Sequence, residues 1–242
     1  MVLARHLYMR MMRRGRVIGL TALASVPGLV YWLSAFDARD GQEAELYSDI
    51  VTTAGFSFTI AALILTVATL REERESGTLP YIYMRPIPRL SLAASAMAAG
   101  TGAALTVALG GWLSTLIAAL AVGAEPSLAI SGLALFVAAA VGYAAVFVPL
   151  GYLVPRAILV GLGYIIVIES ILAAAVTGFA QFSIWRISVS IYADLTDEFG
   201  TAAQDMLGPV TAGVGGGVIK LVAVFAVGLG VLTWALRRRD AL

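Results

Sequence analysis

The sequence predicts an all-α integral membrane protein with six transmembrane helices. Three observations support this fold class: the composition, six long apolar runs and an uneven distribution of arginine. The chain has 242 residues, of which 60% are hydrophobic and 13% are charged, and its mean hydropathy is +0.91. Soluble domains carry about 25% charged residues. Because a chain of this length has too few polar residues to cover its surface, we expect lipid to be part of its solvent.

The composition also excludes several kinds of site. The chain has no cysteine, which rules out disulfides and thiolate metal sites. His6 is its single histidine, which argues against a metal or catalytic centre built from imidazoles. The sequence contains no G-x-x-x-x-G-K-[ST], G-x-S-x-G or H-E-x-x-H motif. We therefore predict no catalytic residues, no bound metal or cofactor, no nucleic-acid partner and no enzymatic activity of the chain by itself.

Six apolar runs are long enough to cross a bilayer, which requires about 20 residues. They cover residues 17–36, 50–70, 90–122, 128–154, 157–180 and 210–236. The first run could belong to a cleaved signal peptide, but it has 20 uncharged residues and no small-x-small cleavage site follows it. An apolar signal region has roughly 7–15 residues. We therefore predict that the first run is a retained span.

The basic residues indicate the orientation of the chain. Thirteen of the 16 would lie on the side that holds both termini: Arg5, Arg10, Arg13, Arg14, Arg16, Arg71, Arg74, Arg85, Arg89, Arg156, Arg237, Arg238 and Arg239. The other side would have Arg39 and Arg186 and ten acidic residues: Asp37, Asp40, Glu43, Glu45, Asp49, Glu125, Asp194, Asp197, Glu198 and Asp205. By the positive-inside rule, both termini face the cytoplasm.

Two segments outside the spans carry apolar residues. Residues 1–16 alternate bulky apolar and basic residues, which predicts an amphipathic helix at the membrane interface whose arginines reach the lipid headgroups. A basic leader that only sets the topology is the alternative. The outer loop 181–209 is long for a compact bundle and begins with aromatic residues. We expect it to pack against the bundle.

Two charges fall inside the predicted spans: Glu169 in the fifth and Lys220 in the sixth. A charge near the middle of a membrane helix costs about 2.5–3.5 kcal/mol on insertion scales. Antiparallel neighbouring spans could bring the two side chains together as an intramembrane polar pair. The pair could lie on a substrate path, or it could only fix the position of the helices, with Lys220 reaching the headgroups as a further alternative.

The cytoplasmic connection between the second and third spans combines charge, glycine and proline. Thr78 can cap a short helix that has Pro80 in its first turn. Pro86 and Pro88 would end that helix, because proline lacks an amide donor and disfavours helix in the preceding residue. The helix would display Tyr81, Ile82 and Tyr83 next to charged residues. Such a surface suits a protein contact, although tyrosines that face the headgroups would produce the same pattern.

This connection resembles a motif of one transporter class. The stretch E-R-E-x-G-T-L followed by R-P-I-x-R, between the second and third of six spans, is similar to that of type-2 ATP-binding-cassette (ABC) exporter membrane subunits, the permeases. The matching residues are Glu73, Arg74, Glu75, Gly77, Thr78, Leu79, Arg85, Pro86, Ile87 and Arg89. The resemblance implies that residues 1–16 form an interfacial helix and that loop 71–89 carries a coupling helix. It also implies re-entrant helices in loop 181–209, before the last span.

The resemblance further implies a role in ATP-driven export. Two permease chains, identical or homologous, would enclose the path, and each would rest on a separate ATPase subunit that binds ATP and Mg²⁺. The docking residues would be Glu73, Arg74, Glu75, Gly77, Thr78, Leu79, Tyr81, Tyr83, Arg85 and Pro86. The domains would be an interfacial helix 1–16, a transmembrane domain 17–236 and a cytoplasmic tail 237–242.

The sequence also allows predictions of where the chain is located, which other functions it could have and what it transports. The resemblance places the chain, as a multi-pass protein in contact with lipid, in a bacterial or archaeal cell (inner) membrane. An ATP-independent secondary carrier that uses Glu169, or a membrane assembly scaffold, is the alternative. A carrier often contains an internal repeat, and residues 1–122 show no similarity to 123–242. The apolar spans favour a hydrophobic or lipid-like substrate.

Overall fold

The chain folds as helices throughout the part that the structure describes. The computed structural model describes residues 2–37, 42–75, 87–196, 199–208, 210 and 212–238, and these contain no strand. Six helical segments within them are long and apolar enough to cross a membrane: Arg14–Ser34, Glu43–Arg74, Arg89–Ala121, Pro126–Leu153, Ala157–Ala175 and Gly213–Arg238. The predicted fold class and the six spans are therefore confirmed.

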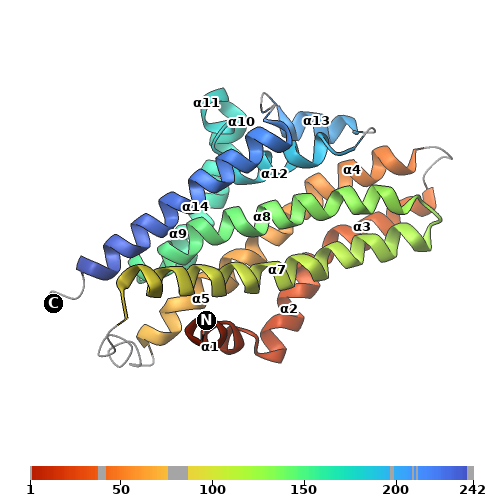
Figure 1. Ribbon diagram of the computed structural model, residues 1–242. Coiled ribbons are helices and arrows are strands. Elements are labelled where there is room, and N and C mark those ends of the chain that lie inside the picture. Colours follow the sequence, from red (N-terminus) through yellow and green to blue (C-terminus); the bar gives the residue numbers. More distant parts are fainter. Residues whose placement is uncertain are drawn as a thin grey trace.

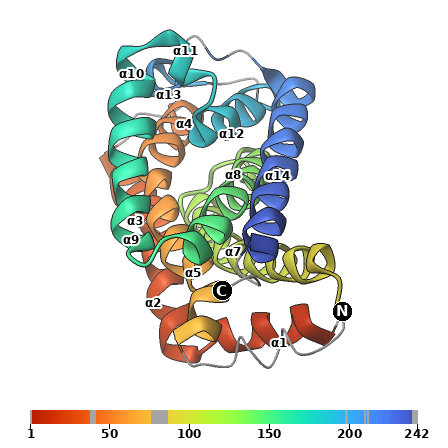
Figure 2. The same ribbon diagram turned by 90° about the vertical axis from the view of Figure 1, so that its left-hand side faces the viewer.

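The first helix lies apart from the spans. Helix α1 (Val2–Met11) runs across, rather than along, α9 and α14 (Figure 2). The first span consists of α2 (Arg14–Ala24) and α3 (Val26–Ser34) and continues into the turn η1 (Ala35–Asp37). Pro27 is the second residue of α3, in the first turn, where the missing amide has no intrahelical partner to lose. The second span consists of α4 (Glu43–Thr53), η2 (Ala54–Phe56) and α5 (Ser57–Glu75).

Single helices form the third, fourth and sixth spans: α7 (Arg89–Ala121), α8 (Pro126–Leu153) and α14 (Gly213–Arg238). The fifth span consists of α9 (Ala157–Gly163), the π-helix η3 (Tyr164–Leu172) and α10 (Ala173–Ala175). Three short helices precede the sixth span: α11 (Thr177–Ala180), α12 (Ile184–Ala193) and α13 (Thr201–Leu207). Helices α10 to α13 and helix α1 lie on opposite sides of the bundle (Figures 1 and 2).

Two spans differ in extent from the sequence-based ranges. The second begins at Glu43 rather than at residue 50, because α4 places Glu43 and Glu45 in its first turn, where carboxylates favour the positive end of the helix. The fifth ends at Ala175 rather than at residue 180, because Val176 has an extended backbone that separates α10 from α11. In Figure 1, helix α1 and the end of α14 lie on the side where α5 ends and α7 begins. The compartment that this side faces stays a prediction.

Helix α8 lies at the centre of the bundle and packs against α5, α7, α12 and α14. Small residues make these close contacts possible, as is common between membrane helices. A methyl group added at Gly151 would overlap the backbone of Val67 on α5. One added at Gly228 on α14 would overlap the carbonyl of Ala145. At these two positions glycine therefore allows the backbone of α8 to lie directly against the backbone of a neighbouring helix.

The contact between α14 and α8 predicts opposite effects of alanine at two glycines of α14. We expect Gly228→Ala to push α14 away from Ala145 and to lower the free energy of unfolding by about 1–3 kcal/mol. Gly230→Ala is the matched control, because nothing lies within 4 Å of its added methyl group. It should raise helix stability by up to about 1 kcal/mol. Thermal unfolding in detergent measures both, and equal effects would contradict the packing argument.

Large apolar side chains remain exposed on the outer faces of the bundle. On the fifth and sixth spans these are Ile158, Leu159, Val160, Ile166, Val167, Ile171, Val218, Ile219, Val222, Val227, Val231 and Trp234. A soluble surface rarely carries such continuous apolar area. The faces therefore suit contact with lipid or with other membrane helices.

Candidate functional site

Helix α1 is held against the bundle by buried apolar and polar contacts. Its residues Leu7 and Met11 are each only 1% exposed. The hydroxyl of Tyr8 lies 2.9 Å from Oγ1 of Thr106 on α7, and Thr69 of α5 donates from Oγ1 to the Met11 sulfur at 3.3 Å. Helix α1 is therefore part of the packed structure. Its location at a membrane surface stays a prediction.

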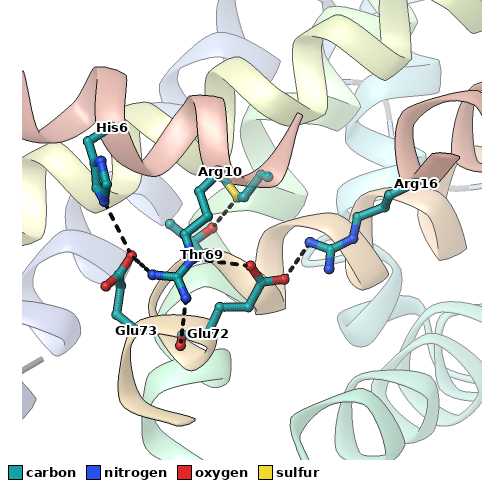
Figure 3. Close-up of polar contacts among 7 residues, drawn as sticks. His6, Arg10, Arg16, Thr69, Glu72 and Glu73 are labelled. Carbon is teal, nitrogen blue, oxygen red and sulfur yellow. Dashed lines mark hydrogen bonds and ion pairs between the residues drawn. The ribbon is translucent and has the colours of Figure 1, made fainter. Parts of the chain in front are cut away.

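A network of charged side chains joins α1 and α2 to the end of α5 (Figure 3). Arg10 donates from Nη1 to Oε1 of Glu73 at 2.6 Å, and Nε2 of His6 lies 3.7 Å from the same oxygen. Glu72 contacts two arginines: its Oε2 lies 3.8 Å from Nε of Arg10, and its Oε1 lies 2.5 Å from Nη1 of Arg16. Arg10 therefore contacts both carboxylates.

The burial of this network indicates how strongly it links the helices. The Glu73 side chain is only 2% exposed, whereas that of Arg10 is 25% exposed. Exposed ion pairs contribute about 0–1 kcal/mol. Removal of one partner from a buried pair costs more, about 3–5 kcal/mol, because the remaining charge loses its compensation. Because the Glu73 carboxylate is buried, we expect the Arg10–Glu73 contact to contribute more than an exposed ion pair and to hold α1 against α5.

The network lies at the base of the predicted coupling loop. Helix α5 ends at Glu75, two residues after Glu73, and Arg74 donates from Nη1 to the carbonyl of Tyr152 on α8 at 3.5 Å. Two of the predicted docking residues, Glu73 and Arg74, are therefore described in full. The side chain of Glu75 lies outside the described residues, as do Gly77, Thr78, Leu79, Tyr81, Tyr83, Arg85 and Pro86 in their entirety.

The far end of the loop is also anchored. Helix α7 begins at Arg89, and Pro88 precedes it as the N-cap residue, with an extended backbone. The carbonyl of Pro88 accepts from the amide of Leu92 at 3.1 Å. Helices α5 and α7 pack against each other. The loop therefore leaves and re-enters the bundle at packed helix ends.

Sequence reasoning missed His6, Arg10 and Arg16 as partners of the loop. It expected Arg10 to extend toward lipid headgroups, whereas the structure directs it to Glu73, 63 positions later in the chain. A basic N-terminal segment and an acidic pair at a helix end were both visible in the sequence. Their pairing depends on α1 packing beside α5, which no local pattern reveals.

Glu169 forms the second polar centre, on the π-helix η3. Its carboxylate accepts from the hydroxyls of Tyr164, at 3.0 Å, and Ser183. It also accepts from the backbone amides of Ile184, at 3.0 Å, and Trp185, at 3.4 Å. These amides are free donors at the start of α12, so the carboxylate acts as a cap for that helix. Glu169 is 5% exposed and fully engaged by donors.

The structure does not bring Glu169 and Lys220 together. Lys220 donates from Nζ to Oε1 of Gln181 at 2.7 Å. Arg186 on α12 is 7% exposed and donates from Nη1 to the carbonyl of Leu207 at 3.4 Å. Burial lowers the pKa of Arg186, and the Glu169 charge opposes that shift. A functional role for Glu169 or Lys220 stays a prediction.

Helix α12 is fixed on several sides. Trp185 donates from Nε1 to the carbonyl of Thr52 at 2.9 Å, and its ring packs edge-on against Phe56. Ser190 accepts the amide of Gly213 at the start of α14 at 2.9 Å. The helix contacts α8 and α14 and is almost entirely buried. Its entry into the bilayer as a re-entrant helix stays a prediction.

Among the described residues, no three or more His, Cys, Asp or Glu side chains lie together so that they could hold a metal ion. A pocket of about 470 Å³ lies where α4 and α8 begin and is lined by Glu43, Glu125 and Thr196, among others. The charged network lies at the opposite end of the bundle, where α5 ends. The polar chemistry of the chain therefore divides between two ends of the bundle.

The comparison with protein families gives a match over most of the chain. Residues 12–176 match the family model described as ABC-2 family transporter protein. This range contains the first five spans, loop 71–89 and Glu169. No curated protein and no solved structure matches the chain.

Proposed function

Because this chain belongs to the ABC-2 family of transporter proteins, we propose that it is the membrane-spanning permease subunit of an ATP-driven exporter. In this proposal the chain itself neither forms nor breaks covalent bonds. A separate ATPase subunit, present in two copies, binds ATP and Mg²⁺ and supplies the energy. The permease transmits that energy to the path through loop 71–89.

The observation that best supports this role is the charged network at the base of the loop. Arg10 and Arg16 connect α1 and α2 to Glu72 and Glu73 on α5. A force applied to the loop would therefore reach the first and second spans together. Rigid links of this kind suit alternating access, in which helices move as bodies between inward-facing and outward-facing states.

The remaining parts of the proposal concern assembly and location. Two permease chains, identical or homologous, would form the path between them in a bacterial or archaeal cell (inner) membrane. The arginine-rich end of the bundle would face the cytoplasm, in accordance with the positive-inside rule. Both termini and loop 71–89 would then be accessible to a cytoplasmic ATPase.

The proposal predicts that the two tyrosines of the loop are needed for contact with the ATPase. We expect Tyr81→Ala combined with Tyr83→Ala to leave the thermal stability of the permease unchanged. The variant should lose the ATPase during copurification, or retain it with ATP hydrolysis uncoupled from transport. Aromatic anchors at interfaces commonly cost 2 kcal/mol or more when truncated, about a thirtyfold loss in affinity.

Tyr164→Phe is a useful control for this experiment, because it removes a tyrosine hydroxyl inside the bundle and leaves the loop unchanged. It should not alter the amount of ATPase that copurifies. Unchanged ATPase binding and unchanged transport in the loop variant would refute the docking assignment. Transport that persists without any nucleotide-binding subunit would instead support a secondary carrier.

A further inference from the structure

The fifth span changes its helical winding between α9 and α10 (Figure 2). These two segments are α-helices, whereas the nine residues of η3 (Tyr164–Leu172) between them form a π-helix. Backbone hydrogen bonds in a π-helix join residues five apart, and such helices are rare. Proline and glycine, which often disturb a regular helix, do not occur within η3. We therefore looked for the cause of the winding in the contacts of its side chains.

The π winding brings Tyr164 and Glu169 onto one face of the span. The two residues are five positions apart, and the Tyr164 hydroxyl donates to Oε1 of Glu169 at 3.0 Å. In an α-helix of 3.6 residues per turn, side chains five positions apart point about 140° away from each other. In a π-helix they lie on nearly the same face, because its backbone bonds have the same spacing. The Tyr164–Glu169 contact therefore depends on the π winding.

A serine hydroxyl and a backbone amide show the same spacing. Ser170 donates from Oγ to the carbonyl of Ile165, five residues earlier, at 3.2 Å. At the end of η3 the amide of Ala173 donates to the carbonyl of Ile168, also five residues earlier. Hydroxyls on α5, α7 and α14 donate instead to the carbonyl four residues earlier: Thr66 to Ala62, Thr106 to Gly102 and Thr233 to Leu229. Side chains and backbone thus follow the π winding together.

The π winding also directs Glu169 toward α12. The carboxylate accepts from the Ser183 hydroxyl and from the amides of Ile184 and Trp185 at the start of that helix. If η3 took α winding while Tyr164 stayed in place, Glu169 would turn away by about a quarter turn or more. The hydrogen bonds to Tyr164, Ser183 and α12 would then be lost together. These contacts therefore stabilise the π winding, and the π winding in turn makes them possible.

We propose that η3 and the start of α12 form one conformational switch. In the π register Glu169 caps α12 and holds it in place. In the α register Glu169 turns away, and the start of α12 is released. Because α12 packs against α8 and α14, release would change how the last span is held. The α register continues the winding that α9 and α10 already have. This proposal does not depend on an ATPase or on transport.

Deletion of Val167 tests the switch by changing a spacing. Val167 is 45% exposed on the outer face of η3. Its loss leaves Tyr164 and Glu169 four positions apart, a spacing that an α-helix places on one face. Because α winding would then keep Glu169 at α12, the released state should become rarer. We expect hydrogen exchange at the amides of Ile184 and Trp185 to slow by about tenfold in the full chain in detergent.

Deletion of Gly163 is the matched control. It shortens the span by the same one residue but leaves Tyr164 and Glu169 five positions apart. Gly163 is exposed, and a methyl group added there would meet nothing within 4 Å. Exchange at the start of α12 should not slow in this variant. The proposal is overturned if both deletions slow exchange equally. It is also overturned if the Val167 deletion unfolds at the normal temperature and leaves exchange unchanged or makes it faster.

Tyr164→Phe tests the switch in a chain of natural length, and it decides the question if the Val167 deletion does not reach the membrane. The variant removes a hydrogen bond that only the π register makes, so the released state should become about tenfold more populated. Exchange should rise by the same factor in a peptide that covers η3 and in one that covers the start of α12, because both open in one event. Faster exchange in α12 alone, or no change in either peptide, overturns the proposal.

Discussion

Replacing Arg10 with methionine is expected to lower the free energy of unfolding by about 3 kcal/mol and to reduce transport. The substitution removes the guanidinium that lies 2.6 Å from the buried carboxylate of Glu73. Breaking a buried ion pair costs about 3–5 kcal/mol. The lower end applies because Arg10 is 25% exposed. Methionine retains the length of the apolar stem, so the loss reports the charge contact. Thermal unfolding and substrate transport in vesicles measure the two effects.

A double variant separates stability from transmission of force. Arg10→Met combined with Glu73→Gln removes both charges of the buried pair. It should recover most of the lost stability, because the buried carboxylate of Glu73 no longer needs a compensating charge and Glu72 keeps its contact with Arg16. Transport should stay reduced, because α1 and α5 are no longer linked by the pair. Arg5→Met controls for loss of an exposed arginine on the same helix. Full recovery of both stability and transport in the double variant would show that the network only stabilises the fold.

The six spans could be predicted from the sequence because each depends on local composition. A run of about 20 apolar residues is sufficient evidence for a span. The beginning of the second span could not be predicted in this way, because the three acidic residues of α4 interrupt the apolar run. One of them, Asp49, accepts the amide of Ala203 on α13 at 2.8 Å. A carboxylate that caps a distant helix looks, in the sequence, like part of a polar loop.

The partner of Glu169 shows the same limit at the candidate site. Charge and depth suggested Lys220, the other ionic side chain inside the spans. The structure instead supplies the backbone amides of Ile184 and Trp185. Every residue except proline carries a backbone donor, so the sequence gives no sign of which donors a buried carboxylate will meet. Charged side chains are visible in the sequence, but the sequence does not show which helix start will present its free amides to a buried carboxylate.

Replacing Glu169 with alanine is the second change with a large expected effect, a loss of about 3 kcal/mol in the free energy of unfolding. The carboxylate accepts from two hydroxyls and two backbone amides. Each buried donor left without an acceptor costs about 1–3 kcal/mol, and local relaxation recovers part of the total. The start of α12 should loosen, so hydrogen exchange at Ile184 and Trp185 should become faster. Mass spectrometry of a peptide that covers 183–187 measures this exchange.

Two further variants decide what Glu169 does. Lys220→Met removes the other intramembrane charge and its contact with Gln181, and it should leave exchange at the start of α12 unchanged. Glu169→Gln preserves the size of the side chain and one carbonyl acceptor while it removes the charge. If exchange and membrane yield stay normal in Glu169→Gln but transport is lost, the charge acts on the substrate path. If transport in Glu169→Gln falls only in proportion to faster hydrogen exchange in α12, Glu169 is a cap that positions this helix. Unchanged hydrogen exchange in Glu169→Ala would refute the capping role itself.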